Sequence, residues 1–397
     1  MSPDPPGIPP DLPPDVLGRI PLFAELQKVL AWSGGPVNWD LARQIAVAQA
    51  AAAEPAHGVD DADAAEFAED ARVAELWIGE ATGIIASSPL GPVRTMTPAQ
   101  WAEHACGAYR ELVDPLAAKV AAAITQQAPD AMGTDAPPGF DAGAMAQALE
   151  RMAPLFLGVQ TGGVIGAVAK DVLGGYDVPL PSDDSATIAI VKSNVDRVAA
   201  DYALDPKQVR MWVTMHEASH RLVFEALPAA RTAFFARFLD SVASLRVDFS
   251  GAIERLQRLD LSDPTGMDAE LGVEGLFDLA GDQTSSEATT RLEQLIALVE
   301  AFCDRMIETA ADGRLPAAGR IAEAVTRHRS GTDGARALRQ FIGLGTSEEP
   351  GRDADAFTRA VLNAGGWPAL GRMWNDTETL PTPGELSDAD AWLRRMD

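Results

Sequence analysis

The stretch MWVTMHEASH, residues 211–220, contains the pattern His-Glu-x-x-His, and the rest of the chain is interpreted around it. Residues four apart on an α-helix lie on one face. In a helix, His216 and His220 would therefore direct ring nitrogens at one metal ion. Glu217, the next residue round the helix, would reach a water molecule beside that ion. This pattern is typical of a zinc site with a carboxylate general base.

The residues around the motif favour the helix that the spacing requires. Asp205 suits an N-cap, Pro206 suits the first helical position, and Gln208 can complete a capping box. Apolar and histidine positions then recur at three- and four-residue steps, and the pattern ends at Leu227-Pro228. The sequence therefore predicts a helix with the motif at its middle and on its buried face.

Chance does not readily explain the motif. The chain has only five histidines in 397 residues, so a random His-Glu-x-x-His has a probability of roughly 0.5%. Two alternatives stay open at this point. The helix could carry two incidental buried histidines, or it could be a metal-binding helix that has lost its ion.

Composition excludes several classes of partner. Lys and Arg number 32 against 58 Asp and Glu, which gives a net charge of −26. Nucleic acid and anionic membranes would repel such a chain, so we expect neither as a partner. Cys106 and Cys303 lie far apart without a pattern and form no disulfide framework, although a single bridge between them stays open. The Pro-rich start lacks the pattern of a signal peptide. We therefore expect a cytoplasmic protein.

The pattern along the chain predicts a mainly α fold with few short strands. Residues 1–18 are expected to be a disordered Pro-rich tail, and residues 19–397 a single domain. A mobile linker is expected near 128–139, and a flap or insertion near 260–286. The apolar run Met152–Ala169 favours a buried core helix over a membrane span. Residues 187–191 form the best strand candidate, either an edge strand for extended substrate or a short strand without that role.

A catalytic zinc needs a third protein ligand. The next histidine, His328, lies in a basic segment that we expect to be solvated. Glu225 would project about 140° away from His220 on the same helix. Glu300 is the stronger candidate because it interrupts an apolar helical segment, with Asp304 one turn later on the same face. An ordinary salt bridge would also explain Glu300.

The chain resembles an actinobacterial family of zincin-like metallopeptidases, a domain of unknown function with some members labelled coenzyme F420 biosynthesis-associated. The family has a His-Glu-x-Thr-His helix and a downstream Leu-Leu-Glu-Gly-Tyr-Ala segment that aligns with residues 298–303. The resemblance implies a compact, mostly helical zincin domain with Glu300 as third ligand. It is carried by residues 35–39, 175–181, 212–220, 224–228, 298–300, 380–382 and 392–393.

Two departures from the family pattern touch the predicted site. Ser219 stands where the family usually has Thr. Phe302 replaces a Tyr that could have donated to an oxyanion, or merely packed. The three remaining tyrosines include Tyr176, which we take as the best candidate for an oxyanion donor.

Together, the motif and the resemblance predict a zinc-dependent peptidase acting on a peptide or protein substrate. His216, His220 and Glu300 would bind Zn²⁺, with Glu217 as general base and Asp304 orienting a ligand through a hydrogen bond. One alternative is a non-catalytic interaction protein with a degenerate or structural metal site. A metal hydrolase of non-peptide amides would use the same residues. The sequence predicts neither the specificity nor the oligomeric state.

Overall fold

A computed structural model describes residues 34–52, 59–86, 91–131, 142–177, 180–181, 188–246, 286–345, 347 and 349–397. The predicted tail at 1–18 and most of the predicted flap, 260–285, lie outside these residues. So do residues 132–139 of the predicted linker, whereas residues 128–131 continue a helix.

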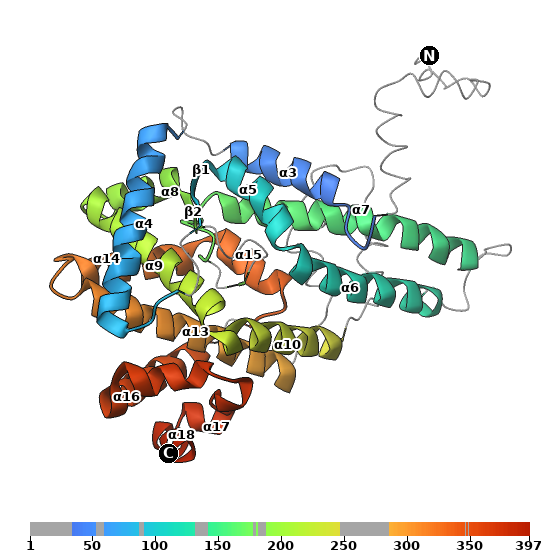
Figure 1. Ribbon diagram of the computed structural model, residues 1–397. Coiled ribbons are helices and arrows are strands. Elements are labelled where there is room, and N and C mark those ends of the chain that lie inside the picture. The colour runs from blue at the N-terminus through green and yellow to red at the C-terminus, as the bar shows by residue number, and fades with distance from the viewer. Residues whose placement is uncertain are drawn as a thin grey trace.

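Helices dominate the described part of the chain, which confirms the predicted mainly α class (Figure 1). The α-helices are α3 (Trp39–Ala51), α4 (Asp61–Thr82), α5 (Pro98–Ala108), α6 (Arg110–Ala131), α7 (Ala142–Ala169), α8 (Lys192–Asp201), α9 (Pro206–Ala226), α10 (Pro228–Ser244), α13 (Glu287–Ala311), α14 (Ala318–Gly331), α15 (Asp333–Phe341), α16 (Glu349–Gly371), α17 (Pro383–Leu386) and α18 (Ala389–Met396). Short 3₁₀ turns cover Arg372–Trp374 and Thr377–Thr379, and the strands are β1 (Val93–Met96) and β2 (Ile188–Val191).

Helix α9 carries the His-Glu-x-x-His motif and begins where the sequence predicts. The Asp205 carboxylate accepts from the Lys207 backbone N–H at 2.9 Å. Gln208 does not complete a capping box. Its Nε2 instead donates to Asp205 at 3.3 Å, and its Oε1 accepts from the Ala317 backbone N–H at 3.0 Å. Gln208 therefore ties the start of α9 to the segment before α14.

Helix α9 is buried on all sides over its central part, whereas the sequence predicts a single buried face. Every residue from Trp212 to Phe224 is buried, since α4, α8, α10, α13 and β2 all pack around the helix. One connected cluster of buried apolar side chains extends from Val37 to Trp392. The motif thus lies inside the core, where water is excluded and polar groups need partners.

Strand β2 is enclosed on both edges. It pairs in parallel with β1, with Val93 opposite Ile188 and Met96 opposite Val191. On its other edge, the Gly175 N–H donates to the Ala189 carbonyl at 2.9 Å, and the Val191 N–H donates to the Leu173 carbonyl at 2.9 Å. Of the two roles open for this strand, the edge strand for substrate is therefore wrong.

Helix α7 packs closely on α3, as the small residues in its sequence suggest. By length and composition the segment Glu150–Ala169 is apolar enough to cross a membrane, but 61% of it is buried inside the protein. A Cβ added at Gly158, Gly162 or Gly166 would lie within 2.8 Å of an α3 atom or of Asn38, the N-cap of α3. The glycines let the two helices approach to a separation that larger residues would prevent.

Replacing Gly162 with alanine should therefore destabilise the protein. The new Cβ would lie 2.5 Å from the Ala42 carbonyl oxygen, a backbone atom that cannot rotate away. Overpacking of this kind lowers the free energy of unfolding by about 1–3 kcal/mol. The loss is measured as a lower urea concentration at the midpoint of unfolding. The control is Gly107→Ala in α5, where an added Cβ meets nothing within 4 Å. Equal midpoints for the two variants would contradict the close packing.

Candidate metal centre

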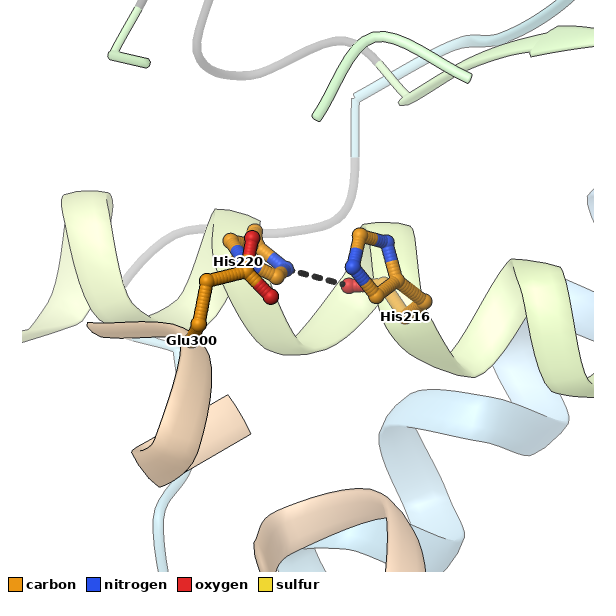
Figure 2. Close-up of side chains that lie close together, drawn as sticks. All are labelled: His216, His220 and Glu300. Carbon is orange, nitrogen blue, oxygen red and sulfur yellow. Dashed lines mark hydrogen bonds and ion pairs between the residues drawn. The ribbon is translucent and has the colours of Figure 1, made fainter. Parts of the chain in front are cut away.

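Three donor groups converge at the middle of α9. His216 and His220 lie one turn apart with ring centroids 4.2 Å from each other. Glu300 reaches them from α13, and its Oε1 lies 3.4 Å from His220 Nε2 (Figure 2). Each residue offers one ligand atom, and these atoms all lie within 4.8 Å of one another. Helices α9 and α13 bring together residues that are 80 positions apart in the sequence.

The histidine nitrogens suit a metal because they lack other partners. His220 Nδ1 lies 3.0 Å from the His216 carbonyl oxygen, which orients the ring (Figure 2). His220 Nε2 and both ring nitrogens of His216 are buried without a hydrogen-bond partner among the described residues. Buried polar atoms in folded proteins are normally satisfied. A bound ion would take one nitrogen from each imidazole together with a carboxylate oxygen of Glu300, and would so give partners to two of these three nitrogens.

Protonation states also fit a zinc ion. Burial, followed by the charge of Arg329, lowers the pKa of His216 well below its usual value, so its imidazole is neutral at neutral pH. Burial raises the pKa of Glu300, but its interaction with His220 and the charges of Arg329 and Arg339 outweigh the burial and lower the pKa overall. A neutral imidazole at His216 and an ionised carboxylate at Glu300 are the forms that bind zinc.

Glu217 lies beside this group in a cradle of backbone amides. Its side chain is fully buried. Oε2 accepts from the N–H of Gly175 at 2.9 Å and of Tyr176 at 3.1 Å. Oε1 also accepts from the Tyr176 N–H, at 3.2 Å, and lies 3.5 Å from His216 Nδ1. Burial and the charge of Asp177 raise the pKa of Glu217 to about 8, although the two amides and Arg329 oppose the rise.

The loop that holds Glu217 is itself fixed from the opposite side. Trp101 Nε1 donates to the Gly174 carbonyl at 3.2 Å, and the Tyr109 hydroxyl donates to the Gly175 carbonyl at 3.3 Å. The Leu173 N–H donates to Asp177 Oδ2 at 2.7 Å. The loop therefore presents its amides to Glu217 in a set direction.

Tyr176 lies at the site, where its ring packs on His220 and its backbone N–H binds Glu217. The ring stacks on His220 at a centroid distance of 5.7 Å and on Phe224 at 5.9 Å. Its N–H is one of the two that hold Glu217. Burial and the charge of Glu217 raise the pKa of its hydroxyl, so it stays protonated. Its role as oxyanion donor stays a prediction.

The other sequence candidates lie around the three donors. Asp304 is exposed on α13, and in the described part of the chain it makes no hydrogen bond to the three donors. Surrounding protein and the charge of Glu300 nevertheless raise its pKa to about 6. Glu225 pairs with Arg221 at 2.9 Å. His328 Nε2 contacts the Asp171 carbonyl at 2.7 Å, away from the donors.

The sequence reasoning missed two residues near the centre, Arg329 and Asp177. Residues 327–329 were expected to be solvated, but the Arg329 side chain is only 22% exposed and contacts Asp177 at 2.6 Å. Its charge reaches His216, Glu217 and Glu300 strongly enough to shift their pKa values. Arg329 directly follows His328 in the sequence. No local pattern indicates its contact with Asp177, which lies 152 residues away.

Comparisons with known proteins show the fold and the family of the chain. A solved structure from Chloroflexus aurantiacus, described as a "putative hydrolase with a novel fold", is 20% identical and matches with a TM-score of 0.61 over 91% of this chain and 99% of that chain. At that identity the likeness shows a shared fold. No curated protein matches the chain. The model of a family described as zincin-like metallopeptidase matches residues 37–393. The chain therefore belongs to the zincin-like metallopeptidase family.

Proposed function

We propose that the protein is a zinc-dependent peptidase in which His216, His220 and Glu300 hold the ion and Glu217 is the general base. One observation carries the proposal. The ligand atoms of the three residues lie within 4.8 Å of one another, with buried histidine nitrogens that have no other partner. The family supports a metal-dependent peptidase in general, and the residue roles are inferred from the geometry.

Glu217 is suited to move a proton in peptide hydrolysis. When bound, zinc would polarise the scissile carbonyl and lower the pKa of an attacking water. Burial raises the pKa of Glu217 to about 8, and a cation bound beside it would favour the ionised form that a base needs. In that form Glu217 would take the proton at Oε1, the oxygen nearer His216, and deliver it to the leaving amine. The amides of Gly175 and Tyr176 hold the other oxygen, so the carboxylate keeps its direction through both transfers.

Metal content tests the ligand assignment. Purified wild-type protein is expected to carry about one zinc per chain by mass spectrometry after zinc loading, and His216→Ala and Glu300→Ala are expected to lose it. Glu225→Ala is the control, since Glu225 pairs with Arg221 rather than facing the donors. Zinc retained in Glu300→Ala would refute Glu300 as a ligand. No zinc in the wild type would favour the non-catalytic alternative, a zincin-fold interaction protein with a degenerate site.

Cleavage of a peptide library, with and without a chelator, tests the reaction. Chelator-sensitive cleavage would support the peptidase, whereas zinc binding without peptide cleavage would favour a hydrolase of non-peptide amides.

We further infer a cytoplasmic location, because the buried Cys106 and Cys303 are both free and suit a reducing compartment. The association with coenzyme F420 stays a prediction.

A further inference from the structure

The peptide group that joins Gly175 to Tyr176 connects Tyr109 with the candidate general base. Its N–H donates to both carboxylate oxygens of Glu217, at 3.1 and 3.2 Å, and its carbonyl oxygen accepts from the Tyr109 hydroxyl at 3.3 Å. The described chain contains no cis peptide bond, and in a planar trans peptide the C=O and the N–H point in opposite directions. A donor that fixes this carbonyl therefore also fixes the direction of the N–H that binds Glu217.

The preceding peptide group, which carries the Gly175 N–H, is held independently of Tyr109. Its carbonyl oxygen accepts from Trp101 Nε1 at 3.2 Å, and its N–H, besides binding Glu217, donates to a carbonyl oxygen of strand β2 at 2.9 Å. Loss of the Tyr109 hydroxyl should therefore release the Tyr176 amide more than the Gly175 amide. An experiment that observes the Tyr176 amide by itself can isolate the contribution of Tyr109.

Tyr109 is itself placed by the junction of helices α5 and α6. Its N–H donates to the Ala105 carbonyl and its carbonyl accepts from the Val113 N–H, both at 3.0 Å. Its ring packs edge-on against Trp101 at a centroid distance of 6.3 Å. Burial and the charge of Glu217 raise the pKa of its hydroxyl, so the group stays protonated and can donate. The hydroxyl therefore reaches the loop from a fixed position.

We propose that Tyr109 is a positioning residue for Glu217, acting through the peptide group between Gly175 and Tyr176. The proposal rests on the peptidase function proposed above and adds to it a residue that supports the general base from behind the loop. A base must lie within hydrogen-bond reach of the proton that it accepts, and small misplacements lower the rate. Because the effect belongs to proton transfer, substrate binding should not depend on Tyr109.

Removal of the hydroxyl should leave the protein folded. Tyr109→Phe keeps the ring and its packing. A cavity of about 20 Å³ lies beside the hydrogen bond, and Tyr109, Gly175 and Tyr176 are among the residues that line it. This is room for roughly one water molecule, which can bind the Gly175 carbonyl in place of the hydroxyl. A water molecule satisfies the carbonyl, but it does not hold it in one direction as an anchored side chain does.

The test compares Tyr109→Phe with the wild type and with Tyr202→Phe, all loaded with zinc. Tyr202 is the matched control, because it is a half-buried tyrosine at the end of α8 whose hydroxyl makes no hydrogen bond in the described part of the chain. Zinc content and melting temperature are measured first. The chain has three tyrosines, so labelling with [¹⁵N]tyrosine gives three amide resonances. Each variant removes one of them, and the resonance that both variants keep belongs to Tyr176.

In Tyr109→Phe, kcat should fall about 10-fold, the upper range for one hydrogen bond, at unchanged KM. The Tyr176 amide proton resonance should move upfield, because its hydrogen bond to the carboxylate becomes weaker. Glu217→Gln replaces the carboxylate with a weaker acceptor and should move this resonance further in the same direction. Tyr202→Phe should change neither kcat nor the resonance. A purely structural role of the hydroxyl would lower the melting temperature without this pattern.

A wild-type kcat in Tyr109→Phe would overturn the proposal, and so would a Tyr176 resonance that stays in place. A fall in kcat that only follows a matching loss of zinc would also overturn it, since the hydroxyl would then support the metal site as a whole.

Should the wild type cleave no peptide, the peptidase function fails and the spectra decide on Tyr109 by themselves. An upfield movement of the Tyr176 resonance in both Tyr109→Phe and Glu217→Gln would still support the positioning of Glu217. A resonance that responds to Glu217→Gln but not to Tyr109→Phe would, in that event, overturn it.

Discussion

Glu217→Gln is expected to keep zinc and lose peptide hydrolysis, with kcat lower by about 10²–10⁴-fold, the usual contribution of general acid–base catalysis. Glutamine has nearly the size of glutamate and keeps one carbonyl oxygen. That oxygen can take the place of Oε2 and accept from the amides of Gly175 and Tyr176. The NH₂ group then faces His216, where it cannot accept a proton. Single-turnover kinetics on the zinc-loaded variant measure the effect.

Three measurements decide how this result is interpreted. Zinc content must match the wild type, since otherwise the loss belongs to the metal. The melting temperature must show a folded protein, because Glu217 is buried in the core. Glu225→Gln serves as control, since it is a glutamate on the same helix that pairs with Arg221 instead. Hydrolysis at the wild-type rate in Glu217→Gln would remove Glu217 as the general base.

The sequence predicts the parts of the structure that depend on neighbours along the chain. The start of α9 at Asp205 and Pro206 follows from local capping chemistry. The pair of histidines one turn apart follows from the helical period. In each case the partners lie within four residues, so their spacing fixes their geometry.

Contacts between distant segments are beyond such reasoning. Glu300 meets His220 because α13 packs on α9, and apolar periodicity on either helix does not specify the partner. Its choice as a candidate came from a charge in an apolar segment, together with the family resemblance. Arg329 and Asp177 had no comparable signal, because an arginine in a basic stretch is usually solvated. The burial of α9 on all sides was also missed, since polar residues on its outer face find partners such as Glu75 and Glu225 for Arg221.

Replacing Gly174 with alanine is expected to disable the site while leaving its ligands in place. An added Cβ would lie 2.3 Å from Glu217 Cδ, 2.4 Å from Glu217 Oε1 and 2.9 Å from the Ala189 carbonyl oxygen. The carbonyl oxygen belongs to β2 and cannot move away. Glu217 must then leave the cradle, or the loop must shift and withdraw its amides. Because either change misplaces the proton acceptor, kcat should fall by about 10²-fold or more.

The neighbouring glycine makes the test specific. At Gly175 an added Cβ would meet its nearest atoms at 3.5 Å, an ordinary contact, and the N–H to Glu217 would stay. Gly175→Ala should therefore keep most of the activity and stability. Gly174→Ala should, besides losing activity, lower the free energy of unfolding by about 1–3 kcal/mol through overpacking.

Urea unfolding and turnover of the two zinc-loaded variants measure both effects. If the two alanine variants lose activity equally, the close approach of Gly174 to Glu217 has no special role. If Gly174→Ala alone loses it with zinc retained, the loop must hold Glu217 in place for catalysis, because the metal ligands are unchanged.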